Sequence, residues 1–187
     1  EILKLDAQWH EKPLPGAWFE VKNAKTGELF RMVTGSDGKA VSEELPAAYL
    51  GDDGRAVPYE YQVREIQAPE GFCLDHRVWK FWFNNDHTPV AVQKIKAENE
   101  ETRLWFSKSS FHTDHFVKGA RLSIYNAKAE NGKMQPWGEP LETWISGPEP
   151  HLVSGKLSGG RTYFLVEEEA PEGYSAADPV MFTVSAG

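Results

Sequence analysis

Residues 61–72 read Tyr-Gln-Val-Arg-Glu-Ile-Gln-Ala-Pro-Glu-Gly-Phe, and residues 163–174 read Tyr-Phe-Leu-Val-Glu-Glu-Glu-Ala-Pro-Glu-Gly-Tyr. Both follow the frame Tyr-x-(Val/Leu)-x-Glu-x-x-Ala-Pro-Glu-Gly-aromatic, at an offset of 102 residues. The upstream segments 15–25 and 118–128 also match, at an offset of 103 residues. A fixed offset of this size indicates one structural unit used twice, and it is the size of a whole domain.

Short stretches of alternating apolar and polar residues, separated by turn residues, fill both copies. This pattern predicts an all-β chain of two β-sandwich domains. The domain boundary is expected in the charged stretch 98–103, which gives domains 1–100 and 101–187. The expected strands are 17–21, 29–33, 59–66, 78–83 and 90–97 in the first copy, and 104–108, 120–125, 141–145, 162–168 and 180–184 in the second.

Composition excludes several classes of function. The net charge of −8 disfavours nucleic-acid binding, which requires clustered Lys and Arg. No apolar stretch is long enough to span a membrane. The single cysteine, Cys73, cannot form a disulfide within the chain. The histidines of the segment 112–115 are expected in a loop, since zinc needs three or four converging ligands. We therefore expect no cofactor, no metal and no turnover enzyme.

Five polar residues occupy strand positions whose side chains should face the core. Side chains alternate between the two faces of a strand, so residues two apart share a face. Some polar residues share a strand face with apolar residues, so their side chains are expected to point into the core. These are Lys4, Glu65 and Asn99 in the first copy, and Lys108 and Glu167 in the second.

Burial gives the three residues of the first copy a possible chemistry. It lowers the pKa of an amine and raises that of a carboxyl group, and a neutral amine is a nucleophile. If Asn99 lies between Lys4 and Glu65, the amine can attack the side-chain amide carbon. A protonated Glu65 would donate a hydrogen bond to the amide oxygen, ammonia would leave, and an isopeptide bond would remain. The ordinary alternative is that Lys4 extends its amine to solvent and Glu65 pairs with another base.

The same residues carry a resemblance that covers essentially the whole chain. Lys4-Leu5-Asp6, the run 13–19, Asp37-Gly38 and the segment 61–72 resemble the B-type repeat of Gram-positive collagen adhesins, found also in the major pilins of such bacteria. The resemblance implies two tandem Ig-like, transthyretin- or prealbumin-like, sandwiches. It also implies that Lys4 is a nucleophile, Asn99 its acceptor and Glu65 the acid/base of a single-turnover crosslink.

The second copy departs from this family pattern. Lys108-Ser109-Ser110 replaces Lys-x-Asp, and the final segment 182–187 corresponds to 81–84 of the first copy, before its closing strand. No equivalent of Asn99 is present, so Lys108 and Glu167 form a pair whose acceptor is not found. We expect the second domain to lack its final strand or to borrow one.

The resemblance implies a structural stalk or pilin-type segment. The expected location is extracellular, on a cell-wall-anchored protein whose anchor signal lies outside this sequence, without membrane insertion. The expected partners are neighbouring domains or subunits. Two alternatives remain open: an adhesin module that binds a host matrix protein or glycan through some of the seven Trp residues, and an accessory module of a secreted carbohydrate-active enzyme.

Overall fold

The computed structural model describes residues 1–83, 92–110 and 113–186. The start of the expected strand 90–97 and His112 lie outside the described residues. The described part of the chain is built from strands and connecting turns, and it holds no helix that could cross a membrane. It divides into two compact units, one of Glu1–Pro69 and Cys73–Glu100, the other of Glu70–Phe72 and Glu101–Ala186.

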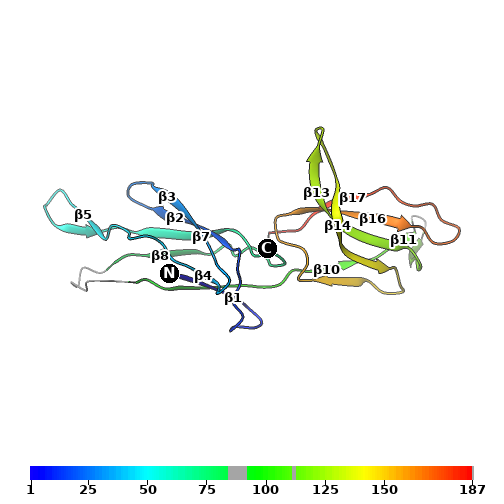
Figure 1. The fold of residues 1–187 in the computed structure, drawn as a ribbon, viewed down its shortest axis with the longest axis horizontal. Helices are drawn as coiled ribbons and strands as arrows, with labels where there is room; N and C mark the ends of the chain where they lie inside the picture. Colours follow the sequence, from blue (N-terminus) through cyan, green and yellow to red (C-terminus); the bar gives the residue numbers. More distant parts are fainter. Residues whose placement is uncertain (84–91, 111–112, 187) are drawn as a thin grey trace. The chain divides into compact units, whose positions relative to one another are not determined.

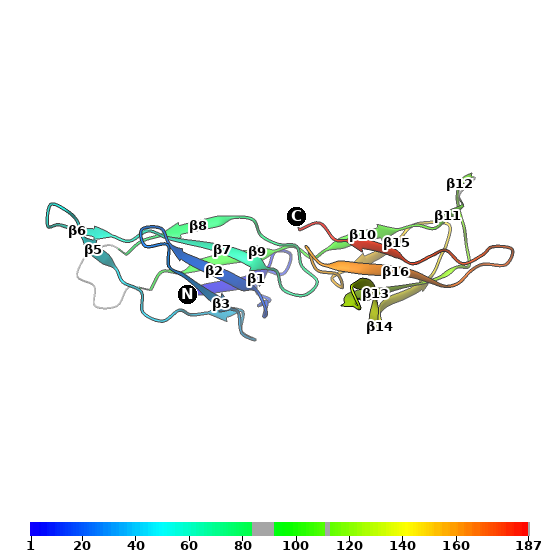
Figure 2. The same cartoon turned by 90° about the horizontal axis from the view of Figure 1, so that it is seen from above.

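The first unit contains two main sheets, which form separate layers in Figure 1. The smaller sheet has the order β4-β1-β9. The larger sheet has the order β3-β2-β7-β8, which can be followed across the sheet in Figure 2, and β5 and β6 form a separate hairpin. The strands are β1 (Ile2–Asp6), β2 (Trp18–Asn23), β3 (Leu29–Val33), β4 (Lys39–Ala40), β5 (Ala48–Leu50), β6 (Ala56–Pro58), β7 (Tyr61–Gln67), β8 (Val78–Phe81) and β9 (Ile95–Asn99).

The first and last strands of this unit are direct neighbours. β1 runs parallel to β9 in a register that places Lys4 opposite Ala97 and Asp6 opposite Asn99. The apolar core between the sheets includes Phe19 and Val63, which are almost fully buried. Lys4 and Glu65 therefore start from opposite layers and point into the same interior.

The second unit repeats the larger sheet and part of the smaller one. Its four-stranded sheet has the order β14-β13-β16-β17, while β10 pairs with β15 and β11 with β12. Within the described ranges β10 has one strand neighbour, whereas its counterpart β1 has two. The strands are β10 (Arg103–Phe106), β11 (Ser109–Ser110), β12 (Thr113–Phe116), β13 (Arg121–Glu130), β14 (Lys133–Ile145), β15 (His151–Ser154), β16 (Thr162–Glu169) and β17 (Val180–Thr183).

The β13–β14 hairpin is longer than the sequence predicts. The expected strands 120–125 and 141–145 extend toward each other and meet at Asn131-Gly132, where both residues have positive φ, as a tight hairpin turn requires. β16 accompanies β13 only as far as Asn126, and beyond it the hairpin continues as two strands (Figure 1). Trp144, within the expected strand 141–145, lies in β14 and is buried.

Candidate functional site

Lys4 is fully buried in the first unit, with no exposed surface. The strand that carries Lys4, β1, has β4 on one side and β9 on the other. The amine Nζ lies 3.1 Å from Glu65 Oε1 and 5.6 Å from the centre of the Phe19 ring. Burial lowers the pKa of Lys4, and the nearby Glu65 carboxylate offsets only part of that effect.

Glu65 bridges the lysine and the asparagine. Its Oε1 faces the Lys4 amine, and its Oε2 accepts a 2.8 Å hydrogen bond from Asn99 Nδ2. Oε2 also accepts a 2.7 Å hydrogen bond from the backbone N–H of Asp75. One carboxyl group therefore contacts the proposed nucleophile through one oxygen and the proposed leaving group through the other.

The amide of Asn99 is oriented differently from the sequence-based expectation. Glu65 was expected to hydrogen-bond the amide oxygen, but it contacts the amide nitrogen, which also donates to the backbone carbonyl of Cys73. Within the described residues the buried Oδ1 atom has no hydrogen-bond partner. This orientation suits proton delivery to the departing nitrogen rather than activation of the carbonyl oxygen.

The second unit reproduces two members of this arrangement. Lys108 Nζ donates a 2.9 Å hydrogen bond to Glu167 Oε2, which also accepts one of 2.6 Å from the backbone N–H of Ala177. Glu167 Oε1 is buried and has no hydrogen-bond partner among the residues that the structure describes. Lys108 lies between β10 and β11 rather than in the expected strand 104–108, and 21% of its side chain is exposed.

Sequence reasoning missed the segment that lies against the first site. Between β7 and β8, Cys73 contributes its carbonyl to Asn99, and Asp75 contributes its N–H to Glu65. These contacts are made by backbone groups, so they cannot be predicted from the residue types. The only available signal was position, since the segment directly follows the Ala-Pro-Glu-Gly turn.

The other candidates offer less chemistry. In the described part of the chain no three His, Cys, Asp or Glu residues converge as metal ligands. Cys73 is a partly buried free thiol, and burial raises its pKa, which disfavours the reactive thiolate. Trp105 on β10 is 66% exposed, and the partly exposed Leu152 is its partner on β15.

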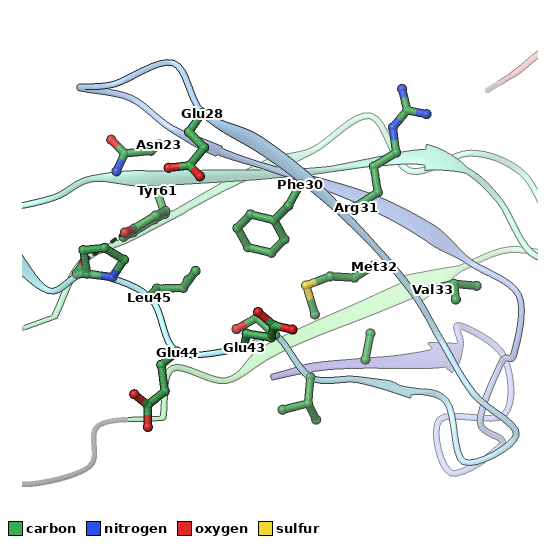
Figure 3. Close-up of a pocket in the computed structure, with 14 residues that line it drawn as sticks. Asn23, Glu28, Phe30, Arg31, Met32, Val33, Glu43, Glu44, Leu45 and Tyr61 are labelled. Carbon is green, nitrogen blue, oxygen red and sulfur yellow. Dashed lines mark hydrogen bonds between the residues drawn. The ribbon is translucent and has the colours of Figure 1, made fainter.

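The first unit also has a cavity of about 550 Å³ at its side. Figure 3 shows Phe30, Met32 and Leu45 facing it from β3 and from the segment after β4, with Glu43 and Glu44 nearby. None of Lys4, Glu65 and Asn99 lines this cavity. The buried polar cluster is therefore separate from it.

Among the comparisons with known proteins, a family model identifies the kind of domain. The family model described as SpaA: Prealbumin-like fold domain matches residues 1–98 and 102–187. No curated protein matches the chain. Among solved structures it is similar to the Bacillus anthracis TIE protein, with 24% identity and a TM-score of 0.43 over 98% of this chain but 30% of that one.

Two pilin structures are similar at lower identity. The shaft pilin SpaA from Lactobacillus rhamnosus GG has 16% identity and a TM-score of 0.41, covering 100% of this chain and 92% of that one. A Streptococcal ancillary pilin has 21% identity and a TM-score of 0.45, covering 98% of this chain and 57% of that one.

Proposed function

Because the chain belongs to the family of SpaA prealbumin-like fold domains, present in two tandem copies, we propose that it is a stalk or pilin-type segment of a Gram-positive surface protein. In this proposal the domain 1–100 is locked by an amide bond between Lys4 and Asn99. Its partners are neighbouring domains or subunits of the same surface structure. The observation that carries the proposal is the fully buried contact of Lys4 and Asn99 with the two oxygens of Glu65.

The geometry supports a balanced reaction. Glu65 Oε1 removes a proton from the Lys4 amine, which the apolar surroundings already disfavour as a cation. The Nζ lone pair attacks Asn99 Cγ to form the N–C bond. Glu65 Oε2 delivers that proton to Nδ2, the Cγ–Nδ2 bond breaks, and ammonia leaves. Glu65 Oε1 then accepts the second proton that Nζ still carries, so the products are a neutral amide, ammonia and a protonated Glu65. Holding the groups together supplies the effective concentration that free amines and amides lack in water.

The test is the intact mass of the folded protein, measured beside Lys4→Ala and Glu65→Ala variants. We expect the unaltered chain to weigh one ammonia less than its sequence, and both variants to have their full sequence mass. A full mass for the unaltered chain would refute the crosslink. A deficit of two ammonias would show that Lys108 had also found an acceptor.

A ligand-binding adhesin module is the second candidate, and the exposed pair Trp105 and Leu152 favours it. Exposed aromatic side chains next to apolar ones are common anchors of interfaces. Glycan-array or matrix-protein binding that is lost in Trp105→Ala but kept in Trp9→Ala would support this function. Trp9 is a suitable control because it is similarly exposed and lies in the first unit.

A further inference from the structure

The segment 73–77 contacts both groups that Lys4 must meet, the Glu65 carboxyl group and the Asn99 amide. Its Cys73 carbonyl accepts from Asn99 Nδ2, and its Asp75 N–H donates to Glu65 Oε2 over 2.7 Å. If this segment moved, the acceptor amide and the carboxyl group would both lose a hydrogen bond that sets their orientation. Whatever fixes the segment therefore controls the alignment of the reacting groups.

Asp75 is the side chain that fixes it. Its Oδ1 accepts a 3.0 Å hydrogen bond from the backbone N–H of Arg77, which closes an Asx turn. The guanidinium of Arg77 adds hydrogen bonds of 2.6–3.0 Å to both carboxylate oxygens. Burial alone would raise the pKa of Asp75, but the hydrogen bonds from Arg77 outweigh it and hold the pKa below its ordinary value.

Arg77 is itself held in place on its outer side. Its guanidinium lies 5.4 Å from the centre of the Trp79 ring on β8, while most of its side chain remains exposed. The Asp75 carboxylate is almost fully buried beneath it. The Arg77 guanidinium thus covers the turn on its solvent side. On the other side, backbone groups of the segment contact Glu65 and Asn99.

The second unit shows which part of this arrangement the fold requires. Ala177 lies ten residues after Glu167, as Asp75 lies ten residues after Glu65, and its N–H makes the same hydrogen bond to the carboxylate. A methyl group at Ala177 cannot form an Asx turn. The backbone contact therefore belongs to the fold, whereas the Asp75 turn is an addition in the copy that also has Asn99.

We propose that Asp75 is a positioning residue for the Lys4–Asn99 bond, acting through its turn with Arg77 to orient the Glu65 carboxyl group and the Asn99 amide. This inference rests on the proposed function. It predicts a change in the rate of bond formation rather than in the fold. Misplacing a reacting group by about 1 Å can cost about 100-fold in rate, so loss of the turn should be readily measurable.

The experiment follows ammonia loss by intact mass against time. Each full-length chain is isolated unreacted in denaturant and refolded by dilution. We expect Asp75→Ala to form the bond at least about tenfold more slowly than the unaltered chain, on the scale of such misalignments. Asp75→Asn retains the turn acceptor without the charge and should react within about threefold of the unaltered rate.

Asp53→Ala is the matched control. Asp53 also closes an Asx turn, with the N–H of Arg55 at 3.0 Å, and pairs with the Arg55 side chain, but it lies at the β5–β6 hairpin. Its replacement should leave the rate unchanged. Circular dichroism of Asp75→Ala combined with Lys4→Ala, which cannot react, reports whether the fold is intact.

The outcomes separate the two proposals. No ammonia loss from the unaltered chain refutes the crosslink itself. Bond formation by Asp75→Ala at the unaltered rate overturns the positioning role, and so does an Asp75→Asn variant as slow as Asp75→Ala. If Asp75→Ala does not fold, a folded Asp75→Ser variant decides, because its hydroxyl supports the turn only weakly. An unaltered rate in Asp75→Ser would overturn the role, and a slower rate would support it.

Discussion

At the scale of single residues, the two lysines face different environments. Lys4 has no exposed surface, whereas 21% of the Lys108 side chain is exposed. Burial lowers the pKa of Lys4 even though Glu65 is 3.1 Å away. The folded first unit therefore releases the Lys4 proton more readily than the unfolded chain does, and its stability before bond formation must depend on pH.

The sign of this dependence follows from proton counting. An Asn99→Ala variant retains Lys4 and Glu65 but has no acceptor, so its unfolding stays reversible with respect to the bond. Between the lowered pKa of folded Lys4 and its ordinary value of 10.5, the unfolded state binds more protons. The free energy of unfolding should rise with pH across that window and the Lys4 contribution should level off above it.

Urea unfolding of Asn99→Ala at a series of alkaline pH values would measure this. The comparison is the same variant carrying Lys4→Met, in which this contribution is absent. The difference in unfolding free energy between the two should change with pH in favour of the lysine-containing chain. A difference that stays constant, or that moves in favour of Met, would contradict the assigned direction.

At the scale of elements, the turn before β4 determines where β1 lies. The carbonyl of Gly38 accepts a 2.8 Å hydrogen bond from the Lys4 N–H, and Gly38 has a φ of 71°. A Cβ atom there would come within 2.5 Å of the Lys4 carbonyl oxygen and 2.8 Å of Pro13 Cβ. Gly54 occupies an equivalent Asp-Gly turn with a φ of 76° and nothing within 4 Å.

This pair permits a controlled test of the close approach. In the Asn99→Ala background, Gly54→Ala should cost about 1 kcal/mol for the positive φ alone. Gly38→Ala should cost about 1–3 kcal/mol more, because backbone and proline atoms have to move. Denaturant titration measures both. Equal costs would show that β1 adjusts freely to the added methyl group.

Strand prediction succeeded where alternation was regular and failed where it was not. The expected strand 29–33 coincides with β3, and the core positions of Tyr61, Val63 and Glu65 follow the parity of β7. The middle of β14 was missed because Pro136, Gly138 and Pro140 are ordinarily strand breakers. β14 is an edge strand, and an edge strand tolerates proline because its outward N–H groups need no partner.

Part of the candidate site could be predicted from the sequence and part could not. Lys4, Glu65 and Asn99 could be selected from sequence because each shares a strand face with apolar residues. The direction of the Asn99 amide and the roles of Cys73 and Asp75 could not, since they depend on backbone groups of an irregular segment. Periodicity reports which face a side chain takes, but not which atom of an amide meets a carboxylate.

At the scale of the whole molecule, the proposed bond would stabilise the first unit against unfolding. It would join β1 to β9, close to both ends of that unit. By analogy with disulfides, closing a loop of this length stabilises by up to about 4–5 kcal/mol. The first unit of the unaltered chain should therefore unfold at a higher denaturant concentration than that of Glu65→Ala, and equal midpoints would argue against a bond in the folded protein.

The proposed Lys4–Asn99 bond would also change how the first unit carries mechanical tension. Tension applied between the two ends of the chain would pass from β1 to β9 through a covalent bond, so the residues between Lys4 and Asn99 would be shielded from it. Stretching single molecules of the unaltered chain should release length from the second unit but not from this loop. Lys4→Ala should add an unfolding step of roughly 300 Å, the extended length of the freed loop. Such a step in the unaltered chain would show that the load is carried by hydrogen bonds alone, and the stalk function would then have to rest on the sheets.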